Sequence, residues 1–169
     1  MNRREMAIFA REWYSKKKPY YCSMRGEIDV KSRTGECLMR HDRGFNCAQS
    51  VACTYADLVG MDEQTLFRMS EGLGLGMGGM QGTCGALSGA CVLAGLKNSG
   101  GDLDAPTTKA QTYQLSRELV RQFQEKAGAT ACKDLKGVET GVVLHPCPDC
   151  ITDAAAIVEQ VLFPEVFGE

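Results

Sequence analysis

Apolar residues recur along most of the chain at intervals of three and four, the spacing that places them on one face of an α-helix. The spacing is clear in residues 5–14 and in two long segments of the second half, 106–126 and 148–162. Signals for strands are few, and Val142–Leu144 is the best of them. The pattern therefore predicts an all-α fold, built as a single-domain compact helical bundle.

Capping residues and glycines set the boundaries of the expected helices, because Ser, Thr, Asp and Asn favour the position before a helix and Gly the position after it. We expect a loop at 17–31, a glycine-rich loop at 72–82 and a turn near 98–104. This organisation predicts an N-terminal helical extension over residues 1–30 and one globular unit over 31–169. The expected helices span residues 5–14, 32–44, 46–59, 62–71, 83–96, 106–126, 131–135 and 148–162.

Composition and charge exclude several classes of protein. With 169 residues, 44% of them hydrophobic, the chain is long enough for one domain with a hydrophobic core. The formal net charge of −2 lacks the basic surplus of a nucleic-acid binder, so we expect no nucleic-acid partner. The uncharged stretch 85–96 is shorter than the roughly 18–20 residues that a membrane span needs, and the N-terminus lacks a secretory pattern. We therefore expect a cytoplasmic protein without membrane insertion.

Cysteine is the unusual component of this composition. The chain has nine, an odd number, and no export signal. In a reducing compartment such a set favours metal binding, catalysis or redox sensing over structural disulfides. The nine are Cys22, Cys37, Cys47, Cys53, Cys84, Cys91, Cys132, Cys147 and Cys150.

Four of these cysteines stand at predicted helix starts. Unpaired N–H groups and the helix dipole favour negative charge there by about 0.3–1 kcal/mol. The resulting thiolate is both a nucleophile and a metal ligand, and iron–sulfur clusters are commonly held by four of them. Each cysteine taken alone also fits a small buried side chain. The four are Cys47 after Asn46, Cys84 after Thr83, Cys132 two residues after Thr130, and Cys147 before Pro148.

Glycines beside these cysteines indicate close approach of backbone. Gly85 and Gly89 lie one and five residues after Cys84, on one face of the expected helix, where a neighbouring helix or a cofactor can pack against them. The segment 74–79 fits G-x-G-x-x-G, but it follows a helix rather than a strand, which argues against nucleotide binding. We expect its backbone to pass near the cysteines, with N–H groups free to bond sulfur.

The sequence Phe-Asn-Cys-Ala-Gln at 45–49, the glycine-rich loop, and Thr-Cys-Gly-Ala-Leu-Ser-Gly at 83–89, followed by two further cysteines, resemble the redox-active family named for its C_GCAxxG_C_C motif. The resemblance covers about residues 31–163. It implies that the four recurrent cysteines of the family are Cys47, Cys84, Cys132 and Cys147, and that Cys150 is an addition. The family is similar to the iron–sulfur portion of split-Soret cytochromes c, which are dimers with a cluster beside haem. The resemblance thus implies an iron–sulfur site and a homodimer. It implies no haem, because C-x-x-C-H does not occur in this chain.

Three hypotheses for the chemistry stay open. The first is electron transfer, with an unidentified donor and acceptor, through a cluster of the [2Fe-2S] type on those four cysteines, with Gly85 beside it. The second is thiol–disulfide exchange by Cys147 and Cys150, which form a C-x-x-C pair at a helix start. The third is a zinc site on Cys132, Cys147, Cys150 and His145. Cys53 and Cys91 are expected to pack in the core, whereas Cys22 and Cys37 receive no role.

Overall fold

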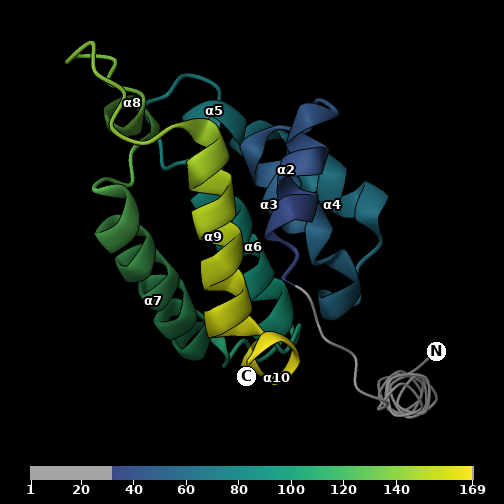
Figure 1. Cartoon of the computed structure of the whole chain (residues 1–169). Helices are drawn as coiled ribbons and strands as arrows, with labels where there is room; N and C mark the ends of the chain where they lie inside the picture. Colours follow the sequence, from purple (N-terminus) through teal and green to yellow (C-terminus); the bar gives the residue numbers. More distant parts are fainter. Residues whose placement is uncertain (1–31, 169) are drawn as a thin grey trace. The chain divides into compact units, whose positions relative to one another are not determined.

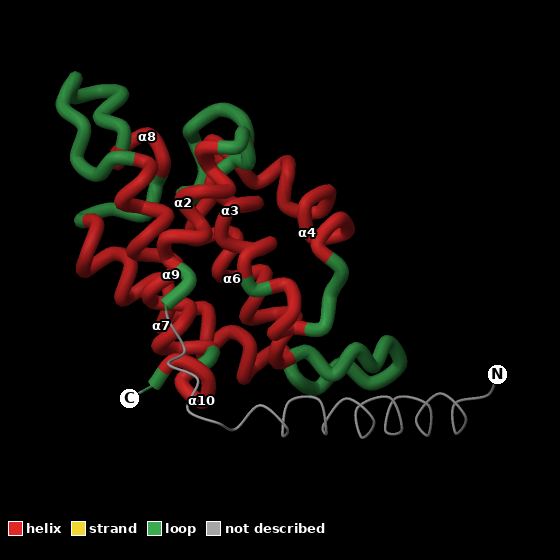
Figure 2. Tube along the Cα trace, turned by 45° about the vertical axis from the view of Figure 1, so that its right-hand side comes forward, coloured by secondary structure: helices red, strands yellow, loops and turns green. Residues whose placement is uncertain are grey.

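The computed structural model describes residues 32–168 (Figure 1). Helices make up most of this part, and it holds no strand, only an isolated antiparallel bridge between Thr83 and Ala131 (Figure 2). The all-α prediction is confirmed. The weak strand signal at 142–144 gives no strand, because the backbone bends there, and the helix expected at 5–14 lies outside the described residues. The α-helices are α2 (Thr34–Asp42), α3 (Cys47–Thr54), α4 (Glu63–Ser70), α5 (Gly74–Met77), α6 (Gly85–Asn98), α7 (Lys109–Ala127), α8 (Cys132–Leu135), α9 (Cys147–Leu162) and α10 (Pro164–Phe167), with 3-10 turns η1 (Ala56–Val59) and η2 (Glu71–Leu73).

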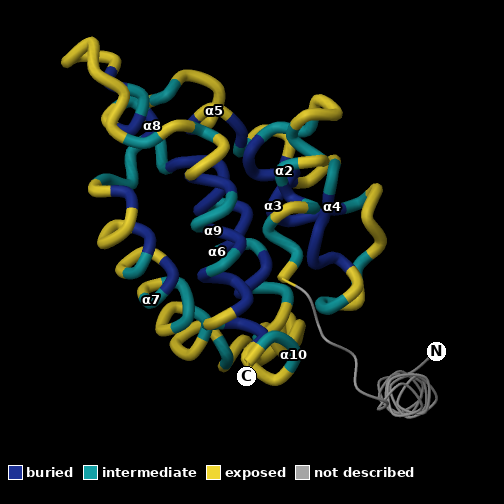
Figure 3. The backbone as a smooth tube through the Cα atoms, in the orientation of Figure 1, coloured by how far each residue is buried: buried dark blue, intermediate teal, exposed yellow. Residues whose placement is uncertain are grey.

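Helices α6 and α9 form the centre of the bundle. Helix α6 packs against α3, α7 and α9, and α9 also contacts α2. Buried residues follow these two helices, whereas exposed residues cover the outer side of α7 (Figure 3). Within residues 32–168, no helix has both the length and the apolar character that crossing a bilayer requires.

The contact between α3 and α6 depends on two glycines. A Cβ atom at Gly89 would lie 2.6 Å from the carbonyl oxygen of Ala48, and one at Gly85 would lie 2.8 Å from the sulfur of Cys47. Both distances are shorter than Cβ contacts in folded proteins, so only glycine permits this spacing. The expected close approach at Gly85 and Gly89 is confirmed, and it brings the start of α3 against the start of α6.

Two helix boundaries differ most from the expected ones, and the others shift by one or two residues. The helix expected at 46–59 is broken at Tyr55, whose buried hydroxyl donates to Oε1 of Glu159 on α9 (2.8 Å) and so fixes this residue to a different helix. The helix expected from Pro106 begins only at Lys109, because Thr108 holds the preceding turn: its hydroxyl accepts from the N–H of Gly100 (3.2 Å). The short helices α10 and α5 were not predicted, and α5 lies within the expected glycine-rich loop at 72–82.

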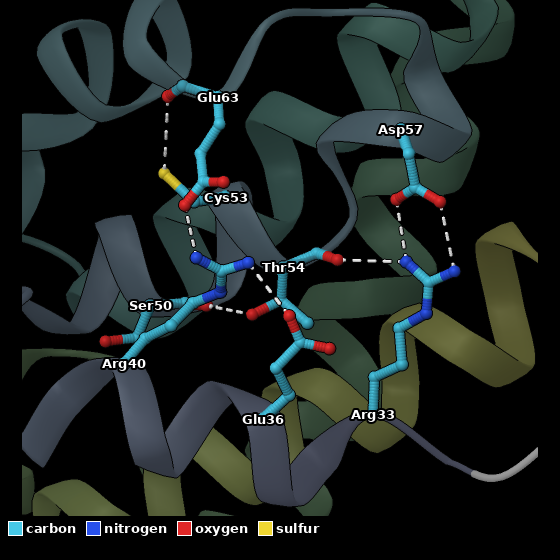
Figure 4. A network of polar contacts seen from close by, with 8 residues as sticks. All are labelled: Arg33, Glu36, Arg40, Ser50, Cys53, Thr54, Asp57 and Glu63. Carbon is cyan, nitrogen blue, oxygen red and sulfur yellow. Dashed lines mark hydrogen bonds and ion pairs between the residues drawn. The ribbon is translucent and has the colours of Figure 1, made fainter.

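Polar contacts fasten α2 to the segments that follow α3 (Figure 4). Arg33 forms two hydrogen bonds with the Asp57 carboxylate, at 2.7 and 3.0 Å. Arg40 pairs with Glu36 on its own helix and with Glu63 at the start of α4. These pairs hold α2 against η1 and α4, and no cysteine takes part in them.

Candidate functional site

Five cysteines lie together at the end of the bundle where α9 begins, close to α5 and α8 (Figure 1). Each stands at a helix start. The sulfurs lie close enough to interact electrostatically, because negative charge on Cys47, Cys84 or Cys147 raises the pKa of the Cys132 thiol. We call this group the cysteine site. Its members are Cys47, the first residue of α3; Cys84, the residue before α6; Cys132, the first of α8; and Cys147 and Cys150 in the first turn of α9.

Asn46 fixes the start of α3 and therefore the position of Cys47. Its side chain accepts hydrogen bonds from the N–H groups of Ala48 and Gln49 (3.0 and 2.9 Å), and the Gln49 side chain accepts from the Asn46 N–H (2.9 Å). This is a complete capping box. The prediction of Asn46 as the cap is confirmed.

The glycine-rich loop supplies backbone to the site through a left-handed turn at residues 75–78, in which four successive φ angles are positive. The N–H of Leu75 donates a hydrogen bond to the Cys47 sulfur. A Cβ atom at Gly76 would lie 2.5 Å from the Cβ of Cys132, so the turn passes directly over that cysteine. The expectation that N–H groups of this loop reach sulfur is confirmed. In the sequence, the alternating glycines were the one available signal for this run of left-handed residues.

The starts of α6 and α8 are joined by backbone. The N–H of Cys84 donates to the carbonyl of Thr130 (2.7 Å), and Thr83 pairs with Ala131. The two threonines were expected to be helix caps, and this was wrong: Cys84 and Ala131 hold the cap positions. The bridge explains the difference, because it holds both segments extended up to the residue before each helix. It also sets Cys84 beside the turn that carries Cys132.

The charge of Cys84 is favoured by its surroundings. A hydrogen bond from the Cys150 thiol is the main cause that lowers the pKa of Cys84 to about 7, against the opposing effect of burial. The nearby N–H groups of Leu87 and Ala86 and the positive charge of His145 lower it further. Cys84 is therefore the thiol of the site that ionises near neutral pH, although it is only 4% exposed.

The thiols around Cys84 favour their protonated forms. The pKa of Cys150 is raised, first because its proton is shared with Cys84 and then by burial. Burial is also the main cause that raises the pKa of Cys132 to about 11 and that of Cys47 in the same direction. The site thus combines one sulfur that readily carries negative charge with neighbours that keep their protons.

Two basic side chains stand at the edge of the site. Lys136 hydrogen-bonds to the half-buried Cys147, and this bond raises the lysine pKa. His145 pairs with Asp153 through its Nε2 atom (2.9 Å), as well as acting on Cys84. Lys136 was not predicted; its place four residues after Cys132, on the same helical face, was the available signal.

The side chains do not form a ready metal site as they lie. Among residues 32–168, no group of three or more His, Cys, Asp or Glu side chains is placed to hold a metal ion. The thiols would have to turn toward a common point before they could share one, whether in the four-cysteine set or in the set with His145.

The other described cysteines lie away from the site. Cys53 is buried in a small second core, where its thiol lies 3.8 Å from the Glu63 carbonyl (Figure 4), and Cys91 packs at the edge of the main core beside Ser116. Both core predictions are confirmed. Cys37 is fully buried, which raises its pKa to about 11, and Cys22 lies outside the described residues. All eight cysteines within 32–168 are free thiols.

Comparison with known families adds the identity of the chain. Residues 45–161 match a family model described as "Putative redox-active protein (C_GCAxxG_C_C)". The chain belongs to the C_GCAxxG_C_C family. The resemblance inferred from its motifs is confirmed, and membership of the C_GCAxxG_C_C family assigns the chain to redox-active proteins. The matched segment includes every member of the cysteine site. Searches of curated proteins and of solved structures gave no match.

Proposed function

We propose that the protein carries electrons on an iron–sulfur cluster of the [2Fe-2S] type. One observation supports this most directly: thiols from four separate helix starts lie close enough for charge on one to shift the pKa of another. Four thiolates are the usual ligand set of such a cluster. The proposed ligands are Cys47, Cys84, Cys132 and Cys147.

The surroundings of these sulfurs fit a cluster chemically. Hydrogen bonds to ligand sulfur and nearby positive charge tune iron–sulfur centres. The site offers both, through the Leu75 N–H on Cys47 and the Lys136 ammonium on Cys147. Gly85 leaves open the space that a side chain would take from the Cys47 sulfur. Thiols that now keep their protons would release them on binding iron.

Bound at this site, a cluster would supply one-electron transfer. The chain itself would orient the ligands from four helix starts, donate hydrogen bonds to sulfur and exclude most of the water, since Cys147 alone among the four is more than slightly exposed. Electrons would enter and leave on the side of Cys147. The donor, the acceptor, a homodimer and a cytoplasmic location stay predictions.

Metal analysis of anaerobically purified, full-length protein tests the proposal. After reconstitution with iron and sulfide, we expect the two elements in equal amounts and visible absorption from sulfur-to-iron charge transfer. Cys84→Ser and Cys147→Ser should each lose most of the iron. Cys53→Ser is the matched control, because this cysteine is also buried but lies in the second core, and it should keep the iron.

A colourless, iron-free protein after reconstitution would refute the cluster. Stoichiometric zinc in the same sample would instead support the zinc hypothesis. The zinc content of single variants of Cys132, Cys147, Cys150 and His145 would then identify the ligands, because replacing a ligand lowers it.

A further inference from the structure

The backbone that lies over Cys132 is the part of the glycine-rich loop with left-handed residues. We call residues 75–80 the cover. A Cβ atom at Gly76 within it would lie 2.5 Å from the Cβ of Cys132 and 3.5 Å from its sulfur. Beneath this backbone Cys132 is only 5% exposed. An ion that approaches from this side therefore meets the cover before it reaches the sulfur.

We propose that the cover is a gate, which opens away from α8 and so admits a metal ion to the Cys132 sulfur. This goes beyond the cluster proposed above, because it states how a metal reaches one of its ligands. The identity of the ion rests on that proposed function. The opening itself is a property of the metal-free protein.

Backbone strain favours the open position. Five of the six residues of the cover have positive φ angles, and three of the five are not glycine. A residue with a Cβ atom is strained in this conformation, because the Cβ lies close to the following carbonyl oxygen. The strain is released when the residue leaves the left-handed region. The three are Leu75 (φ 52°), Met77 (60°) and Met80 (62°).

Hydrogen bonds that water can replace hold the cover closed. The N–H of Lys133 on α8 donates to the carbonyl of Met80 (2.9 Å), and the N–H of Gly82 donates to that of Gly76 (3.1 Å). The net contribution of such bonds is small where water takes the place of the lost partner. At the tip of the cover, a Cβ atom at Gly78 or Gly79 would meet nothing within 4 Å.

The two ends of the cover are anchored independently of it. Before the cover, the Asn46 side chain donates to the carbonyl of Glu71 (2.9 Å) and packs on Gly74, where a Cβ atom would lie 2.6 Å from the Asn46 Cγ. After the cover, the N–H of Cys132 donates to the carbonyl of Gly82 (3.0 Å). The cover can therefore move while the starts of α3 and α8 stay in place.

Metal binding requires a movement of this kind. Within residues 32–168, no three His, Cys, Asp or Glu side chains are placed to hold a metal ion, so the thiols must turn before they can share one. Cys132 has little room to turn while the backbone of Gly76 packs on its Cβ. Opening of the cover supplies both this room and an entry path, which a metal site needs.

Thiol labelling of the full-length, metal-free protein tests the inference. The protein is treated with N-ethylmaleimide at one pH, with and without urea below the unfolding transition. Trypsin then releases Cys132 and Cys37 on separate peptides, 127–133 and 34–40. Cys37 is fully buried in the main core, so its labelling reports opening of the whole fold. We expect faster labelling of Cys132, with little dependence on urea, since a local opening exposes little surface.

Two variants change the strain in opposite directions. Gly78→Ala strains the closed cover without a clash, because φ is 82° there and the space is open; labelling of Cys132 should become about 3- to 10-fold faster. Leu75→Gly relieves strain at an exposed residue and should slow labelling about 2- to 5-fold, since the freedom of glycine in the open state offsets part of the relief. Gly79→Ala is the matched control. Its space is equally open and its φ lies outside the left-handed region, so it should not speed labelling.

Two results would overturn the gate. One is a rate of Cys132 labelling that neither Gly78→Ala nor Leu75→Gly changes. The other is labelling of Cys132 at the rate and with the urea dependence of Cys37, which would mean that only unfolding of the whole domain exposes it. The wild-type protein alone can give the second result, so a variant that fails to fold does not protect the idea. Failure to bind iron would refute the proposed function instead, with the labelling rates still deciding the gate.

Discussion

Replacing Gly89 by alanine tests whether glycine sets the spacing of α3 and α6, and with it the position of Cys47 beside Cys84. In an ordinary helix interior this change stabilises a protein by about 0.5–1 kcal/mol, because glycine loses more backbone entropy on folding. Here the new Cβ would meet the backbone of Ala48, at 2.6 Å from its oxygen and 3.2 Å from its Cα. Backbone cannot rotate away as a side chain can.

The size of the effect follows from the missing space. Ordinary contact begins at 3.4 Å, so the oxygen of Ala48 is 0.8 Å too close. Overpacking of this kind costs about 1–3 kcal/mol, and a clash with backbone belongs near the upper end. After the gain in helix propensity, we expect Gly89→Ala to lower the free energy of unfolding by about 1–2 kcal/mol. Gly95→Ala, on the same helix with nothing within 4 Å, should raise it by about 0.5–1 kcal/mol.

Urea unfolding followed by circular dichroism measures both variants against the wild type. The two should move in opposite directions, and thermal unfolding should follow by about 2–4 °C per kcal/mol for a chain of this length. If Gly89→Ala proves as stable as the wild type or more so, the spacing of the two helices is not limited by this glycine. Some other contact would then have to hold Cys47 beside Cys84.

Three further outcomes follow from the structure. In metal-free protein, the thiolate ultraviolet absorbance that is lost in Cys84→Ser should titrate with a midpoint near pH 7, and Cys150→Ala should move that midpoint upward; a midpoint near 9 in the wild type would contradict the assigned hydrogen bond. Since an unfolded thiol ionises near pH 9, the lowered pKa of Cys84 favours the folded state more at pH 9 than at pH 6. Asn46→Ala should lower the free energy of unfolding by about 1–2 kcal/mol in urea, because it removes the capping box, and an unchanged midpoint would refute this role. Tyr55→Phe should cost about 1–3 kcal/mol in thermal unfolding, because it removes a donor from the buried Glu159 carboxylate; equal stability would show that Arg33 alone satisfies it.

The sequence could predict those parts of the site that depend on a few neighbouring residues. The cap at Asn46 and the glycine pair at 85 and 89 are of this kind, because a capping box or a helical face is decided within one or two turns. The helix start near each motif cysteine followed from the same local rules. Local sequence therefore placed the four motif cysteines near helix starts, and the family resemblance grouped them.

What the sequence could not predict depends on contacts between distant segments. Thr83 and Thr130 have the composition of caps, yet a bridge between their two segments moved the helix starts by a residue. Cys150 reads as the partner of Cys147 in sequence, but packing of α9 on α6 turns it toward Cys84. Propensity and spacing describe neighbours along the chain, and neither contains this information.

The left-handed turn at residues 75–78 has a consequence for how the site communicates. Leu75 and Met77 within it adopt a backbone conformation that costs about 1–2 kcal/mol for each non-glycine residue. The turn holds that conformation while it contacts Cys47 and Cys132. A change in the chemical state of either buried sulfur therefore changes the free energy of the loop conformation. Both strained residues expose their apolar side chains. A reaction at the sulfurs beneath would therefore change the conformation of an exposed apolar surface.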